Sequence, residues 1–177
     1  MIYPYNFILY GVIFVSVFLI GIPTIYAMLF GAPWVPTPIL AVRRMVIEAN
    51  LKKGKKIYDL GCGDGRLLIE STKKGATAVG YEISPLVYIA GFLRCLFYPN
   101  ATILLKSFWR EDISDADVVF FYLLPKSIKS LLEKFRKELK KGTLIISYAF
   151  EIKDLKPIKK IERDRARGLC PIWVYKI

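Results

Sequence analysis

The sequence contains no histidine, and it has no charged side chain before Arg43. Without imidazole groups the chain cannot use a histidine base or a phosphohistidine, and most metal sites are excluded, so we expect no metal. Its three cysteines show no Cys-x-x-Cys spacing, which favours neither a zinc site nor a disulfide framework. No internal repeat or low-complexity tract divides the 177 residues, which suffice for one domain with an appendage.

The charge that is present is strongly basic and unevenly distributed. The net charge is +12, and all 27 lysines and arginines follow residue 42. A basic surface of this kind strengthens binding to anionic membranes. It would also attract nucleic acid, but the sequence contains no nucleic-acid recognition motif, so we expect no nucleic-acid partner.

An apolar run from Phe7 to Phe30 contains only Ser16 and Thr24 as clearly polar residues. As a helix with a rise of ~1.5 Å per residue it would span ~36 Å, enough to cross a hydrocarbon core of ~30 Å. A signal peptide is disfavoured because no basic residue precedes the run. A buried core helix fits 42 uncharged residues less well than a bilayer does. We therefore expect residues 1–32 to form a single N-terminal transmembrane anchor.

Basic residues crowd the C-terminal side of this run, and only the α-amino group lies on the other side. The positive-inside rule then places the rest of the chain in the cytoplasm, as a single-pass membrane protein. The flanking basic residues are Arg43, Arg44, Lys52, Lys53, Lys55 and Lys56.

Residues 55–66 combine a short apolar strand with a glycine-rich turn. Gly61, Gly63 and Gly65 alternate through the turn, and residues 66–70 then have helical character. Because glycine has no Cβ, such a turn lets a ligand approach the backbone closely. The start of the following helix also offers unpaired N–H groups.

Two acids refine this pattern. Asp59 closes the strand before the turn, and Glu82 ends the next apolar strand, 21 residues after Gly61, where an acid accepts hydrogen bonds from ribose hydroxyls. The third glycine comes too early for a dinucleotide fingerprint. Asp64 within the turn would repel a pyrophosphate but suits a ligand with ammonium and sulfonium charges. A tight turn without any ligand is the alternative, which Glu82 disfavours.

With these residues the chain resembles the class I S-adenosylmethionine-dependent methyltransferases. A narrower resemblance rests on Pro-Trp-Val-Pro-Thr at 33–37, ahead of the glycine turn, and on the aromatic end at 171–175. It is to the membrane-anchored protein lysine methyltransferases related to the mitochondrial enzymes that modify ATP synthase and the adenine nucleotide translocase. This resemblance covers nearly the whole chain and implies S-adenosylmethionine as cofactor and a protein with an accessible lysine as substrate.

The resemblance also implies an α/β fold, a Rossmann-like class I methyltransferase sheet with helices on both faces, preceded by one transmembrane helix. We expect a connector and helix at 33–54 and the methyltransferase domain at 55–177. Thr37 and Pro38 predict a helix start by their N-cap and first-turn preferences. The expected helices are 38–51, 86–98 and 125–141; the further strands are 101–105, 116–124 and 143–150, with a terminal hairpin of 156–160 and 169–177.

The predicted helix at 86–98 carries one charge, Arg94. Helices outside such a sheet normally have a polar face, so this one needs a second apolar contact. That contact is either the anchor or the bilayer surface, in which case the helix helps to dock the domain on the membrane. Complete burial in the core is the alternative, and the sequence leaves both open.

The resemblance assigns roles at the cofactor site. Glu82 is expected to hold the ribose hydroxyls, and Gly61 and Gly63 to admit the methionine part of the cofactor. Asp59 and Asp64 are expected to orient its ammonium group.

Three further residues concern the two ends of the cofactor. Thr37 is expected to cap the end that carries the ammonium group. Ser107 stands where the family usually has an acid that contacts adenine, which leaves Asp112 as a possible substitute.

Trp34, Trp109 and Tyr122 are the candidate walls of the substrate site. A lysine nucleophile must be neutral, although its reference pKa is ~10.4. Burial against aromatic rings lowers that pKa, and the rings can hold methylated products by cation–π contact. The alternatives are a membrane-interface residue for Trp34 and an ordinary core aromatic for Trp109. No general base is evident, so we expect the proton to leave through water.

The sequence therefore favours a membrane-anchored protein lysine N-methyltransferase with its catalytic domain in the cytoplasm. Tyr-Leu-Leu-Pro at 122–125 lacks the Asn or Asp of enzymes that methylate DNA bases or glutamine. Two alternatives stay open: methylation of a membrane lipid or quinone, and a non-catalytic S-adenosylmethionine-binding module.

Overall fold

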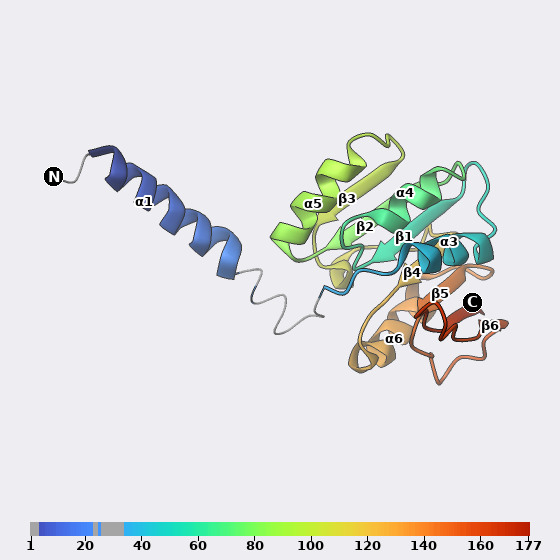
Figure 1. Cartoon of the computed structure of the whole chain (residues 1–177). Coiled ribbons are helices and arrows are strands. Elements are labelled where there is room, and N and C mark those ends of the chain that lie inside the picture. Colours follow the sequence, from blue (N-terminus) through green and yellow to red (C-terminus); the bar gives the residue numbers. More distant parts are fainter. Residues whose placement is uncertain (1–3, 23–24, 26–33) are drawn as a thin grey trace.

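A computed structural model of the chain describes residues 4–22, 25 and 34–177 (Figure 1). Its centre is a sheet with strand order β3-β2-β1-β4-β5-β7-β6. All neighbouring strands pair in parallel except β7, which is antiparallel to β5 and β6. The strands are β1 (Lys56–Leu60), β2 (Thr77–Glu82), β3 (Ala101–Leu105), β4 (Val118–Phe121), β5 (Leu144–Tyr148), β6 (Lys159–Ile161) and β7 (Ile172–Lys176).

Helices cover both faces of the sheet, as predicted (Figure 1). One face packs against α3 (Ile39–Glu48), α4 (Arg66–Thr72) and α5 (Pro85–Cys95). The other packs against α6 (Ile128–Glu138). Alternation along β1 explains the two cores: the side chain of Ile57 belongs to the first, and the side chains of Tyr58 and Leu60 belong to the second. Short 3₁₀ turns are η2 (Phe108–Arg110) and η3 (Pro125–Ser127).

The seven-stranded α/β fold and the terminal hairpin are confirmed, with β7 between β5 and β6. The helix predicted from residue 38 begins one residue later. Pro38 occupies the N-cap position with an extended ψ of 139°, so the Thr37 side chain does not cap α3. The Thr37 carbonyl instead accepts a hydrogen bond from Arg66 Nη1 at 2.8 Å.

The predicted transmembrane helix over 7–30 is not found. Within residues 4–22, 25 and 34–177, no helix combines the length and apolar character needed to cross a bilayer. Here α1 (Pro4–Ser16) has 13 residues, which span only ~20 Å, and a π-helical segment, η1 (Val17–Gly21), follows it. The remainder of the predicted span, 23–24 and 26–30, lies outside the described residues, and the boundaries 1–32, 33–54 and 55–177 stay predictions.

A glycine in α5 lets this helix press against the glycine-rich turn. A Cβ added at Gly91 would lie 2.8 Å from the Gly63 carbonyl oxygen and 2.6 Å from Ile103 Cδ1. Backbone and a buried isoleucine leave little room for adjustment. The close approach of α5 to the turn therefore requires glycine at this position.

We expect Gly91→Ala to lower the free energy of unfolding by about 1–3 kcal/mol, because the added methyl group overpacks this contact. Gly11→Ala in α1 is the matched control, since no heavy atom lies within 4 Å of its added Cβ. Urea unfolding followed by circular dichroism measures both. An unchanged midpoint for Gly91→Ala would show that α5 can move away from the turn without loss.

Candidate active site

A cavity of about 250 Å³ lies at the carboxyl ends of β1, β2 and β4. In an open α/β sheet this edge forms the ligand crevice. All ten residues that the sequence predicted for the site line this one cavity, although their individual roles stay predictions. They are Trp34, Thr37, Asp59, Gly61, Gly63, Asp64, Glu82, Ser107, Trp109 and Tyr122.

The buried carboxylate of Glu82 ties the end of β2 to the glycine turn. Its Oε2 accepts a hydrogen bond from the Gly63 N–H at 3.0 Å. Its Oε1 accepts from the N–H groups of Ile83 and Ser84, both at 2.8 Å. A carboxylate can accept about four hydrogen bonds, so Glu82 keeps capacity for ligand hydroxyls while its position is fixed.

Backbone hydrogen bonds fix the glycine turn, and the side chain of Trp34 packs against it. The N–H groups of Gly61 and Cys62 both donate to the Tyr81 carbonyl, at 3.0 and 2.9 Å. Gly63 has a φ of +58°, and a Cβ added there would lie 2.9 Å from Trp34 Nε1. Only glycine therefore lets the indole of Trp34 lie against the turn, which brings a residue of the connector into the site.

Asp59 is a buried acid beside two others. Burial raises the pKa of Asp59 to about 8, and the negative charges of Glu82 and Asp64 act in the same direction. At neutral pH the carboxyl group therefore holds a proton. A cationic ligand group beside it would favour the charged form.

The carboxylate of Asp64 pairs with two arginines that the sequence pattern did not indicate as site residues. Its Oδ2 lies 2.7 Å from Arg66 Nη2, and it also pairs with Nη1 of Arg94 in α5. Burial raises the pKa of Asp64, but the hydrogen bonds and charge of Arg66 and the charge of Arg94 outweigh this, so the net pKa is lowered. Because Arg66 also binds the Thr37 carbonyl, this ion-pair network fastens the connector to the turn.

Aromatic rings gather at the ends of β4 and β5. The Tyr122 ring is stacked on Phe150, with centroids 6.2 Å apart, and meets Tyr148 edge-on at 5.0 Å. Phe150 also lines the cavity, although the sequence analysis treated it only as the end of a strand. Ala149 before it has a φ of +71°, a left-handed conformation that is strained for alanine. This bend ends β5 at Tyr148 and turns the chain so that Phe150 reaches the cavity.

Trp34 and Trp109, the two tryptophans that line the cavity, are partly exposed. Trp34 is 49% exposed and Trp109, in η2, is 41% exposed, so Trp109 is not an ordinary core aromatic. Ser107 lines the cavity, as predicted. Asp112 does not: its carboxylate accepts hydrogen bonds from the N–H and hydroxyl groups of Ser114 at the surface. Asp112 therefore cannot replace an acid at position 107.

The residues fit a nucleoside-bearing ligand. The hydroxyl of Ser84 lines the cavity, is buried and has no hydrogen-bond partner in the described part of the chain. It lies two residues after Glu82, so an unsatisfied hydroxyl, a carboxylate and a bare glycine turn line one cavity, where a ligand could satisfy them together. Together with the strand order, this site defines a Rossmann-like S-adenosylmethionine-dependent methyltransferase.

Comparison with known proteins identifies the family. The profile described as the ANTKMT methyltransferase domain matches residues 59–159. A protein-lysine N-methyltransferase of Saccharolobus islandicus (strain REY15A) is 36% identical over 150 residues, 82% of this chain and 93% of the relative. The chain belongs to the ANTKMT methyltransferase family, which confirms the resemblance and the expected cofactor.

Two further similarities are more distant in sequence. The human ATP synthase C-subunit lysine N-methyltransferase is 27% identical over 146 residues, which are 81% of this chain but only 60% of that protein. The crystal structure of an RNA methyltransferase from Salinibacter ruber, in complex with S-adenosyl-L-homocysteine, superposes with a TM-score of 0.75 at 29% identity. The superposition covers 81% of this chain and 94% of the Salinibacter ruber chain.

The raised pKa of Asp59 predicts a pH-dependent stability. Between its ordinary pKa of 3.8 and about 8, the folded protein keeps a proton that the unfolded chain releases. The stabilisation is therefore fully present below about pH 4 and is lost as the pH rises towards 8. Asp59→Asn should remove this dependence, so that its free energy of unfolding exceeds that of the parent increasingly as the pH rises from 4 to 8.

Urea unfolding at a series of pH values measures the difference between variant and parent. Asp64→Asn is a control of opposite sign. The pKa of Asp64 is lowered in the folded protein, so this residue stabilises the fold at pH values above its ordinary pKa, and the stabilisation is lost on acidification. A difference for Asp59→Asn that stays constant with pH would contradict the assignment of a protonated carboxyl group.

Proposed function

We propose that the protein is an S-adenosylmethionine-dependent protein-lysine N-methyltransferase that works at a membrane. The observation that carries the lysine assignment is the aromatic part of the cavity. Trp34, Trp109, Tyr122 and Phe150 line the same cavity as the acid and glycines of the cofactor end. The names of the relatives from Saccharolobus islandicus and human support a lysine side chain as the acceptor.

Methyl transfer from the cofactor to an amine requires little covalent chemistry from the side chains of the protein. When bound, the cofactor supplies a methyl group on a positively charged sulfur, open to in-line attack by an amine. Tyr122 and Phe150 would flank the aliphatic part of the lysine and exclude water. Burial between these rings removes water from the ammonium form and disfavours it, so the amine is neutral more often than in solution, and the released proton leaves through water.

The acids near the glycine turn are engaged in interactions that do not suit a general base. Glu82 and Asp64 already accept hydrogen bonds from backbone and arginine groups. Asp59 is buried beside these two acids, where a cationic group of the bound cofactor would pair with it. Each is therefore better suited to positioning the cofactor than to removing a proton from lysine, which agrees with the absence of a base in the proposal.

The membrane part of the proposal rests on the N-terminal residues. No charged side chain precedes Arg43, and the described apolar side chains of α1 and η1, such as Phe7, Phe14 and Leu19, are exposed. Such a surface is stable in contact with lipid. With the basic residues after position 42, the positive-inside rule would keep the catalytic domain on the cytoplasmic side.

Other acceptors give distinct outcomes in one experiment. Full-length protein is incubated with S-adenosylmethionine radiolabelled in its methyl group and a membrane extract that contains proteins, lipids and RNA. We expect label in protein, released on acid hydrolysis as methylated lysine, and no label with Glu82→Ala. Label confined to the organic extract would instead indicate a lipid or quinone. RNA is a specific alternative because of the Salinibacter ruber structure and the basic charge, and label confined to RNA would likewise overturn the proposal. No label would indicate a binding module.

Tyr122 provides a test of the aromatic wall. Tyr122→Ala removes the ring stacked on Phe150, and we expect kcat/KM for the labelled protein to fall about 10²-fold because the lysine loses its position. Tyr122→Phe is the matched control, which keeps the ring and should change the rate little. Affinity for S-adenosylhomocysteine, measured by calorimetry, should be unaffected by either. Full activity of Tyr122→Ala would remove Tyr122 from the substrate site.

A further inference from the structure

The outer side of α5 is an exposed apolar surface. Leu86, Leu93 and Phe97 are 52%, 55% and 84% exposed, at positions that share one side of a helix and the turn after it. The opposite side of α5, with Val87 and Cys95, is buried against the sheet. We call the exposed surface the α5 face; it consists of Leu86, Ile89, Phe92, Leu93, Leu96 and Phe97.

These exposures decide between the two alternatives that the sequence left open, a second apolar contact and complete burial in the core. Complete burial of this helix in the core is wrong, because only the side towards the sheet is covered. In Figure 1, α5 lies over β2 and β3 at the outer edge of the sheet. Six large apolar side chains on one helix and its following turn form the kind of patch that marks an interaction surface in a water-soluble domain.

The charges around the α5 face favour a lipid surface over an acidic or basic protein partner. No acid occurs between Glu82 and Glu111, and the only charged residues in that stretch are Arg94, Lys106 and Arg110. In space, Arg94 pairs with Asp64, and the hollow beside Leu93 and Phe97 adds two further cations, Arg66 and Lys73, against one acid, Glu70. An apolar helical face whose charged neighbours are mainly basic is typical of helices that lie in the interface of a bilayer with anionic lipids.

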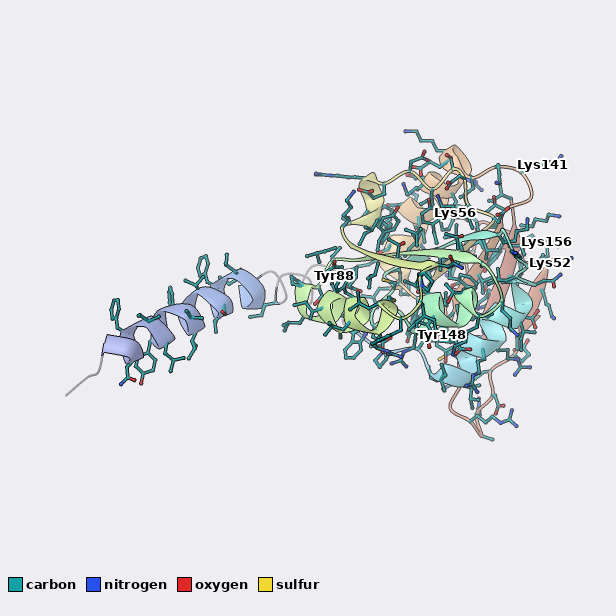
Figure 2. All side chains as sticks on the ribbon, turned by 90° about the horizontal axis from the view of Figure 1, so that it is seen from above. Lys52, Lys56, Tyr88, Lys141, Tyr148 and Lys156 are labelled. Carbon is teal, nitrogen blue, oxygen red and sulfur yellow. The ribbon has the colours of Figure 1, made fainter. Side chains whose placement is uncertain are left out.

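The α5 face is connected to the cavity. Ile83, directly before α5, is exposed and lines the cavity together with the exposed Trp34 and Val35. At the other end of α5, Leu93 and Phe97 share a shallow hollow with Ile39 at the start of α3. In Figure 2, Tyr88 of α5 lies at the opposite end of the domain from Lys52, Lys141 and Lys156. The apolar surface thus runs from the cavity along α5, away from these lysines.

We infer that the α5 face lies on the surface of a lipid bilayer and brings the opening of the cavity next to it. The docking follows from the exposed face and its flanking charges. Its use rests on the proposed function: docking would hold the opening of the cavity at the level of the lipid headgroups. Trp34, Val35 and Ile83 would then be covered by lipid or by the substrate.

A fluorescent probe tests the docking in the full-length protein. Phe97→Cys and, as control, Lys137→Cys on α6 are labelled with an environment-sensitive dye, in a chain whose half-buried Cys170 is replaced by serine. Vesicles contain equal parts of phosphatidylcholine and phosphatidylglycerol, with or without brominated acyl chains. We expect brominated lipid to quench the probe at position 97 and not the probe at position 137.

Two results would overturn the inference. A probe at position 97 that stays in water while the protein is bound to vesicles would show that the face does not dock. A probe that enters an apolar environment but is not quenched by brominated lipid would show that the chain's own N-terminal segment or a second copy covers the face. Neither result would affect lysine methylation in solution, so a failure of docking is distinguishable from a failure of the proposed function.

A paired activity measurement tests the use of the face. The double variant Leu93→Ser, Phe97→Ser should lower methylation of vesicle-embedded protein substrate about tenfold, because apolar burial in the bilayer is lost. Methylation of a soluble lysine peptide should stay unchanged, since neither residue lines the cavity. Ile158→Ser is the matched control, an exposed apolar residue before β6. Equal losses on both substrates, in a variant whose circular dichroism and thermal unfolding match those of the parent, would contradict a docking role.

Discussion

The site depends on the hydrogen bond between the Glu82 carboxylate and the Gly63 N–H, 3.0 Å long. A buried carboxylate needs donors, and the nearest unpaired ones belong to the glycine turn and to the first residues after β2. Parallel pairing of β1 with β2 sets Leu60 beside Tyr81, so the turn after one strand and the acid at the end of the other must meet. The acid that is expected to contact the ligand is thus also the one that shapes the turn.

The glycine turn, once shaped, determines what packs around it. Trp34 lies against Gly63 on one side, and Gly91 of α5 approaches the Gly63 carbonyl on the other. A side chain at either glycine would separate these layers. The connector is fastened further by Arg66, which links Asp64 to the Thr37 carbonyl. The cavity wall contributed by residues 34–37 is therefore a consequence of the turn and its ion pairs, and does not depend on a helix cap at Thr37.

Sequence reasoning predicted those parts of the site that local pattern determines. Glu82, Gly61 and Gly63 follow from strand periodicity and spacing, and they line the cavity as expected. The Asp64–Arg94 pair was missed because it joins residues 30 positions apart through the packing of α5. Phe150 was missed because its place depends on a left-handed alanine, which no pattern signals. No spanning helix is found among the described residues, because α1 ends at Ser16 and hydropathy does not determine where an α-helix ends.

The exposure pattern of α5 explains why this helix has only one charged residue, Arg94. A helix against a sheet needs one apolar side, and α5 satisfies that need with small residues such as Gly91 and Cys95, which let it lie close to the turn. Its leucines and phenylalanines are therefore not required by the core and face outward. Water alone would favour polar residues there. The outward apolar side chains indicate a second apolar surface, and their continuity with Ile83 and Trp34 relates that surface to the entrance of the active site.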